Sequence, residues 1–230
     1  MARAGVDAGM PTTAIASIED KKRLVRRLAG DGRGFAEQYG FGVTNNPAQL
    51  FQVLYLSVLL ARRGDFRKAV DAAAALRDAG WDTAARLARS LHEDRVRVLR
   101  GEGQRSDVDT LAATLGDLAR TLVDRYRGDL RRLRTEAHQD PVRERRLLTA
   151  LPGVDDAVAD LFLREAQAVW REVAPVADRR ALAAARRLGL GRSAQDLAGL
   201  AGSGESERLA WLVGALARVD LEKRYAELTG

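Results

Sequence analysis

The chain has no cysteine at any of its 230 positions, and this absence excludes several kinds of site. Without thiols there can be no disulfide, no thiolate zinc site and no cysteine-bound iron–sulfur cluster. Histidine is nearly absent too, since there are only two, of which His92 precedes Glu93 and Asp94. Consecutive residues of a helix point in different directions, so this triplet does not predict a metal site. We expect neither a metal nor another cofactor.

Long apolar runs are also missing. No stretch stays apolar over the roughly 20 residues that a membrane-spanning helix needs, and no charged-then-apolar leader is present, so we expect a soluble, cytoplasmic protein that does not contact membranes. Aromatic residues make up only 5% of the chain, and runs of β-branched residues are few. Alanine, leucine, arginine and glutamate are abundant instead, and they favour helix. We therefore predict an all-α fold.

The charge balance does not by itself identify a partner. Lys and Arg total 38 and Asp and Glu total 32, which gives a net charge of +6. This excess is modest, and a composition rich in alanine and arginine is as typical of a GC-rich genome as of a DNA ligand. The charge alone therefore leaves open whether the partner is a polyanion.

Cap and breaker residues divide the chain into helices. Asn46-Pro47 is a typical helix start, and the helix predicted from Pro47 to Arg62 is apolar nearly all round, which indicates a central position. Residues 1–11 are predicted to be a disordered tail, and residues 35–43 a loop or short turn. The other predicted helices have these starts or bounds: Thr12 or Thr13 to about Ala29, Asp65 to about Asp78, Asp82 or Thr83 toward Leu91, a basic segment ending at Arg100, 109–126, a short helix after Asp129, a helix from Pro141, a short helix after Ser193, and 206 to about 228.

The segment from Leu147 to Arg180 contains the strongest functional pattern. Leu151-Pro152-Gly153-Val154 interrupts two helical stretches, because Pro152 cannot continue the first helix and Gly153 can adopt a positive φ. The pattern predicts a helix-hairpin-helix. The N–H groups of Val154, Asp155 and Asp156 would then point outward at the positive end of the second helix, where they could bind one phosphate of a nucleic-acid backbone.

Asp178 follows the hairpin and precedes an unbroken run of helix formers, Arg179 to Leu188. Its carboxylate is expected to cap that helix and to stay ionised, because cap hydrogen bonds and the helix dipole both favour the charged form. An aspartate in this position is, on its own, more often a simple N-cap than a catalytic group. Its place after the hairpin is what favours catalysis.

These residues resemble the endonuclease III-like family of helix-hairpin-helix DNA glycosylases. That family has approximately LPGVGRKTA followed by VDTH, and this chain has LPGVDDAVA followed by VADRR. Asp178 matches the catalytic aspartate, Asp155 stands where the family has glycine, and Ala157 stands where bifunctional members have their Schiff-base lysine. The run NPAQLFQVLYLSVLLARRGD is similar to the family's first barrel helix. This similarity places Arg62 at the position where the family has a residue that fills the gap left by the flipped-out base. It is equally consistent with an arginine that lies at a frayed helix end and has no such role.

The resemblance implies an all-helical, two-domain fold with a cleft for double-stranded DNA between the domains. One domain would span 46–167 and contain the hairpin, and the other would combine 12–45 with 168–230. The protein would act as a monomer in base-excision repair. Asp178 would be the catalytic residue, and DNA would be bound by Leu151, Pro152, Gly153, Val154, Asp155, Asp156, Arg62, Arg145, Arg146, Arg179 and Arg180.

The chemistry implied is hydrolysis of the bond between a damaged base and its sugar, without a lyase step because Ala157 replaces the lysine. The alternative is a catalytically degenerate DNA-binding relative. It is motivated by Ala157 and by Asp155 and Asp156, whose charges would repel a phosphate at the hairpin. A helical protein–protein adaptor without DNA affinity is a third hypothesis.

Overall fold

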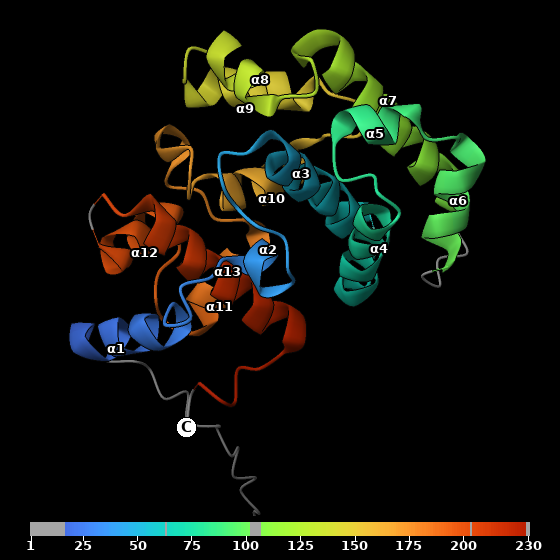
Figure 1. Cartoon of the computed structure of the whole chain (residues 1–230). Helices are drawn as coiled ribbons and strands as arrows, with labels where there is room; N and C mark the ends of the chain where they lie inside the picture. Colours follow the sequence, from blue (N-terminus) through green and yellow to red (C-terminus); the bar gives the residue numbers. More distant parts are fainter. Residues whose placement is uncertain (1–16, 63, 102–106, 203, 229–230) are drawn as a thin grey trace, which may run out of the picture.

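The computed structural model describes residues 17–62, 64–101, 107–202 and 204–228, and every regular element in these ranges is a helix (Figure 1). The elements are α1 (Ile18–Leu28), α2 (Phe35–Gln38), α3 (Pro47–Arg62), α4 (Phe66–Asp78), α5 (Ala84–Arg89), α6 (His92–Gly101), α7 (Val108–Tyr126), α8 (Leu130–Glu136), α9 (Pro141–Thr149), α10 (Asp156–Ala166), the 3₁₀ helix η1 (Arg171–Val173), α11 (Arg179–Arg187), α12 (Ala194–Ala201) and α13 (Ser206–Glu222). The predicted all-α class is confirmed.

Helix α3 is the central element, as its apolar sequence predicted. It begins at Pro47, and the Asn46 side chain accepts a hydrogen bond from the Ala48 N–H at 2.9 Å. Nearly every side chain from Leu50 to Leu59 is buried. Helices α4, α8 and α10 pack against it. Burial on all sides explains why α3 carries no polar face.

The buried apolar side chains form two clusters. The larger cluster surrounds α3 and includes side chains of α4, α7 and α10. The smaller one joins α1, α11, α12 and α13. Helix α13 also packs against α2 and α10, so it links the two clusters. Ala36, Phe41 and Val43 belong to the larger cluster, although they precede residue 46, where the first domain was expected to start. The predicted division into domains stays a prediction.

Most predicted helix starts agree with the structure, and the exceptions lie near the chain ends and in one loop. Asp65, Thr83, Asp129 and Ser193 each cap the helix expected. The first described helix instead follows Ser17, whose hydroxyl accepts a hydrogen bond from the Asp20 N–H at 3.1 Å. The predicted caps Thr12 and Thr13 and the predicted tail lie outside the described residues. The segment 35–43 contains the short helix α2.

The last helix is shorter than expected. Helix α13 ends at Glu222, because Lys223 adopts the left-handed conformation with a φ of 58°, whereas the sequence had suggested about Leu228. The described part of the chain contains no helix that is both long and apolar enough to cross a membrane.

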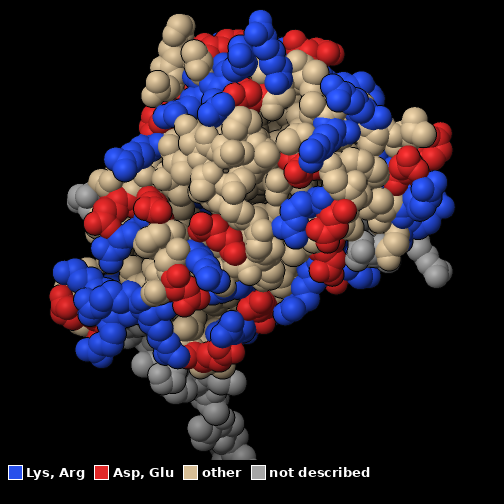
Figure 2. Space-filling model, viewed as in Figure 1, with Lys and Arg blue, Asp and Glu red and all other residues tan. Residues whose placement is uncertain are grey.

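Figure 2 shows how charge is distributed over one face of the molecule. Lys and Arg side chains gather over α8 and α9 and again over α1, and a largely uncharged area lies between these two groups. On α1 the two acidic residues lie in the first turn, where Glu19 pairs with Lys22 and Asp20 with Arg23. Part of the basic charge on this exposed helix is therefore paired within the helix itself.

Candidate active site

The predicted hairpin connects α9 to α10. Gly153 has a φ of 74°, which favours glycine, and a Cβ at this position would overlap Thr114 Cγ2. Leu151 and Val154 have buried side chains that belong to the larger core. The Val154 N–H donates to the Leu151 carbonyl at 3.1 Å. The expectation that the Val154 N–H is free was therefore wrong, because the turn uses this group internally. DNA contact by Leu151 and Val154 stays a prediction.

A negatively charged side chain of the chain itself caps the N-terminus of α10. Asp155 caps the helix by accepting a hydrogen bond from the Val158 N–H at 3.0 Å. Its other carboxylate oxygen pairs with Arg62 at 2.9 Å, and Arg62 also donates to the Gly153 carbonyl at 3.4 Å. Within the described residues, the N–H groups of Asp155, Asp156 and Ala157 have no partner. The N–H groups open to a phosphate are thus those of residues 155–157.

Asp178 caps α11, as its sequence position predicted. Its Oδ1 accepts a hydrogen bond from the Ala181 N–H at 3.2 Å. Its Oδ2 lies 3.2 Å from Nη1 of Arg164, which comes from α10, and the residue is only 4% exposed. The carboxylate is therefore held by two groups. A carboxylate offers about four acceptor positions, so acceptor capacity remains on Asp178.

Arg164 is a site residue that sequence analysis missed. Its guanidinium lies inside the protein, where it also pairs with Glu165 at 2.6 Å and covers the ring of Phe35. Burial by itself lowers the pKa of Arg164, but the carboxylates of Asp178 and Glu165 outweigh it, so that the pKa is raised. The available signal was the adjacent pair Arg164-Glu165 in the second half of α10, where the other residues are apolar. Such a pair predicts a buried partner.

A pocket of about 710 Å³ lies where α3 ends and where α10 and α11 begin. Asp178 and Ala157 both line it, so the structure brings together the two positions that the resemblance marks as catalytic. Leu60, Ala61 and Leu161 supply apolar walls. The remaining lining residues are polar, charged or glycine: Arg62, Gly64, Asp160, Arg179 and Arg180.

The predicted DNA-binding arginines fall into two groups. Three are engaged with carboxylates: Arg62 with Asp155, Arg145 with Asp156 and Asp160, and Arg180 with Asp220. Arg146 and Arg179 are exposed, and neither has a carboxylate partner among the described residues. These two arginines are the ones whose charge is available to a phosphate without breaking an ion pair.

A buried carboxyl group also lies on the helix that enters the hairpin. Glu144 of α9 is fully buried, and neither of its carboxyl oxygens has a hydrogen-bond partner within the described residues. Burial, together with the neighbouring carboxylate of Glu172, raises the pKa of Glu144 to about 8. Glu172 is itself paired with Arg134. Both effects favour the protonated form of Glu144.

No family model and no curated protein sequence matches this chain. Solved structures do. A trapped covalent intermediate of endonuclease III with DNA superimposes with a TM-score of 0.50 at 17% identity, covering 86% of this chain and 85% of that chain. A non-covalent complex of endonuclease III with DNA gives the same values. The 3-methyladenine DNA glycosylase of H. pylori, bound to 1,N6-ethenoadenine, superimposes with a TM-score of 0.57 at 14% identity.

The chain has the fold of the helix-hairpin-helix DNA glycosylases. The likeness to the H. pylori protein covers 89% of this chain and 98% of that one, so it extends over nearly the whole glycosylase fold. At these identities the likeness concerns the fold, and the roles of individual residues have to be argued from the site itself.

Proposed function

We propose that the chain is a monofunctional DNA N-glycosylase, which acts as a monomer on double-stranded DNA and hydrolyses the bond between a damaged base and its sugar. The observation that carries this proposal is the pocket beside the hairpin, onto which Asp178 and Ala157 both open. The glycosylase-like fold supports it independently.

The role proposed for Asp178 follows from the charge that the reaction creates. As the base leaves, positive charge develops on the sugar, and a fixed carboxylate stabilises that charge and orients the attacking water. Arg164 and the Ala181 N–H hold the Asp178 carboxylate in place, which is how a preorganised group is built. The target base must leave the stack to react. The apolar walls formed by Leu60, Ala61 and Leu161 suit the flat face of such a base.

The absence of a lyase step is proposed from Ala157. A lysine amine is what forms a Schiff base with the sugar and leads to strand cleavage, and alanine cannot do so. For the substrate we propose alkylated adenines. This choice is supported by the likeness to the 3-methyladenine DNA glycosylase, which was crystallised with 1,N6-ethenoadenine.

The test is release of free base from duplexes that carry 3-methyladenine, 1,N6-ethenoadenine or a deaminated base. The wild-type protein is expected to release an alkylated adenine and to leave an abasic strand that breaks only after alkali. Asp178→Asn is expected to release at least about 100-fold less, the effect of removing a general base. Asp129→Asn is the matched control, since it changes another helix-capping aspartate outside the pocket and should leave the rate unchanged.

A second function is favoured by two observations. Asp178 is 4% exposed and paired with a buried arginine, and Asp155 places a carboxylate at the hairpin. Both features suit a DNA-binding relative that has lost catalysis. That function predicts salt-sensitive binding to duplex DNA, with no base released from any of the lesions above.

A further inference from the structure

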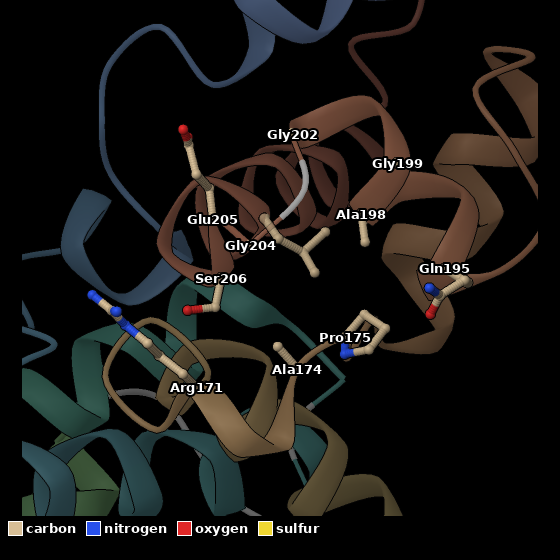
Figure 3. Close-up of a pocket in the computed structure, with 11 residues that line it drawn as sticks. Arg171, Ala174, Pro175, Gln195, Ala198, Gly199, Gly202, Gly204, Glu205 and Ser206 are labelled. Atoms are coloured by element: carbon tan, nitrogen blue, oxygen red, sulfur yellow. The ribbon is translucent and has the colours of Figure 1, made fainter.

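A second pocket, of about 500 Å³, lies between η1 and the segment after it on one side and α12 and α13 on the other (Figure 3). It shares no lining residue with the pocket of Asp178. Ala174, Pro175 and Leu209 make part of its wall apolar, whereas Arg171 and Ser206 bring polar groups to one side. A smaller hollow of about 260 Å³ adjoins it and is also lined by Arg171 and Ser206.

No described side chain caps helix α13, which starts at this pocket. Its N-cap residue, Glu205, makes no side-chain hydrogen bond to the first turn. Within the described residues, the N–H groups of Ser206, Glu207 and Arg208 have no acceptor. By contrast, side chains cap α10, α11 and α12. A helix of 17 residues concentrates positive potential at this uncapped end.

Ser206 provides an independent sign of a ligand. The residue is only 9% exposed, and its hydroxyl makes no hydrogen bond to any described residue. Figure 3 shows the hydroxyl pointing to the side of the pocket where Arg171 lies. The hydroxyl oxygen is not fully sealed from solvent, so it can donate a hydrogen bond to an oxygen atom that enters the pocket.

The charges around the pocket favour an anion. Arg171 is exposed and, among the described residues, has no carboxylate partner. The Glu205 carboxylate points away from the pocket in Figure 3 and pairs with Arg208 at 3.1 Å. Glu207 lines the smaller hollow but not the larger pocket, and its side chain is exposed. The cation and the uncapped N–H groups are therefore not neutralised within the larger pocket.

We propose that this pocket binds the phosphate group of a phosphorylated ligand. The phosphate oxygens accept hydrogen bonds from the Ser206 hydroxyl and the first N–H groups of α13, and Arg171 supplies the opposite charge. The organic part of the ligand packs against Ala174, Pro175 and Leu209. Because the pocket is separate from that of Asp178, this proposal does not depend on glycosylase activity.

The experiment is calorimetric titration of the full chain with inorganic phosphate, with deoxyadenosine 5′-monophosphate and with an undamaged duplex. Arg171→Gln is expected to weaken binding of the phosphate compounds about tenfold, the equivalent of one charge-assisted hydrogen bond. Ser206→Asp places a carboxylate where the phosphate is proposed and is expected to abolish binding. Arg132→Gln removes an exposed arginine of α8 and serves as the matched control with unchanged affinity.

The three titrants distinguish the source of the phosphate. If the nucleotide binds, and both pocket variants weaken its binding, the site belongs to a small phosphorylated molecule. If only the duplex binds, and the same variants weaken it relative to Arg132→Gln, the phosphate belongs to a DNA backbone. The proposal is overturned if neither the phosphate compounds nor the duplex lose affinity in variants that remain folded by circular dichroism.

Discussion

Replacing Arg164 by methionine tests the ion pair that holds Asp178. The substitution keeps a long side chain over Phe35 but removes the positive charge that faces both Asp178 and Glu165. Glu165 retains the Ala36 N–H at 3.0 Å, and Asp178 retains the Ala181 N–H. Two buried carboxylates then lack a cation, and breaking a buried ion pair in this way costs about 3–5 kcal/mol.

The loss is measured by urea unfolding at pH 7, followed by circular dichroism. For a chain of this size, about 3–5 kcal/mol corresponds to a fall in Tm of roughly 10 °C. Arg179→Met is the control, because Arg179 is exposed beside Asp178 and has no carboxylate partner among the described residues, so its effect should stay within about 0.5 kcal/mol. In the double variant Arg164→Met with Asp178→Asn, part of the loss should be recovered. A loss below about 1 kcal/mol for Arg164→Met would refute the ion-pair argument.

Three further predictions concern the hairpin and the pocket. Gly153→Ala should lower the free energy of unfolding by about 1–3 kcal/mol and weaken duplex binding, because φ is 74° and Thr114 occupies the space of a Cβ; an unchanged urea midpoint would contradict this. The pKa of Glu144 is raised to about 8 from its ordinary 4.5, so the folded state holds the proton more tightly and stability falls as pH rises from about 4.5 to about 8. Glu144→Gln, which cannot ionise, should be more stable than wild type at pH 8 by roughly 1–3 kcal/mol and lose that advantage near pH 4.5; equal stability at both pH values would exclude this account. Ala157→Lys should place an amine in the pocket of Asp178, so that borohydride traps a covalent complex with abasic DNA, whereas the wild type should give none.

Local signals in the sequence predicted the helices and their starts. Asn46, Asp65 and Asp178 each cap the helix that follows them, because a cap depends on neighbouring residues alone. The hairpin was predictable for the same reason, since a proline and a glycine at positive φ act within the turn. The first described helix was the exception, because Ser17 rather than an earlier threonine caps it.

The partners of the site residues were not predictable, because they depend on how distant segments pack. The sequence does not indicate that Arg164 would reach Asp178 across the segment containing η1, nor that Arg62 at the end of α3 would pair with Asp155. These contacts change the interpretation of the site. They show that Asp178 is held from two sides and that the hairpin carries a paired carboxylate.

The central claim, that Asp178 promotes the release of a damaged base from duplex DNA, is tested most directly by measuring binding and chemistry on one substrate. A duplex with a single 1,N6-ethenoadenine would be used, with its affinity determined at a fixed salt concentration and free base determined under single-turnover conditions. We predict that Asp178→Asn binds the duplex within about threefold of wild type and releases base at least about 100-fold more slowly. Equal rates of release for the two proteins, or no release by the wild type from any alkylated adenine, would contradict the account.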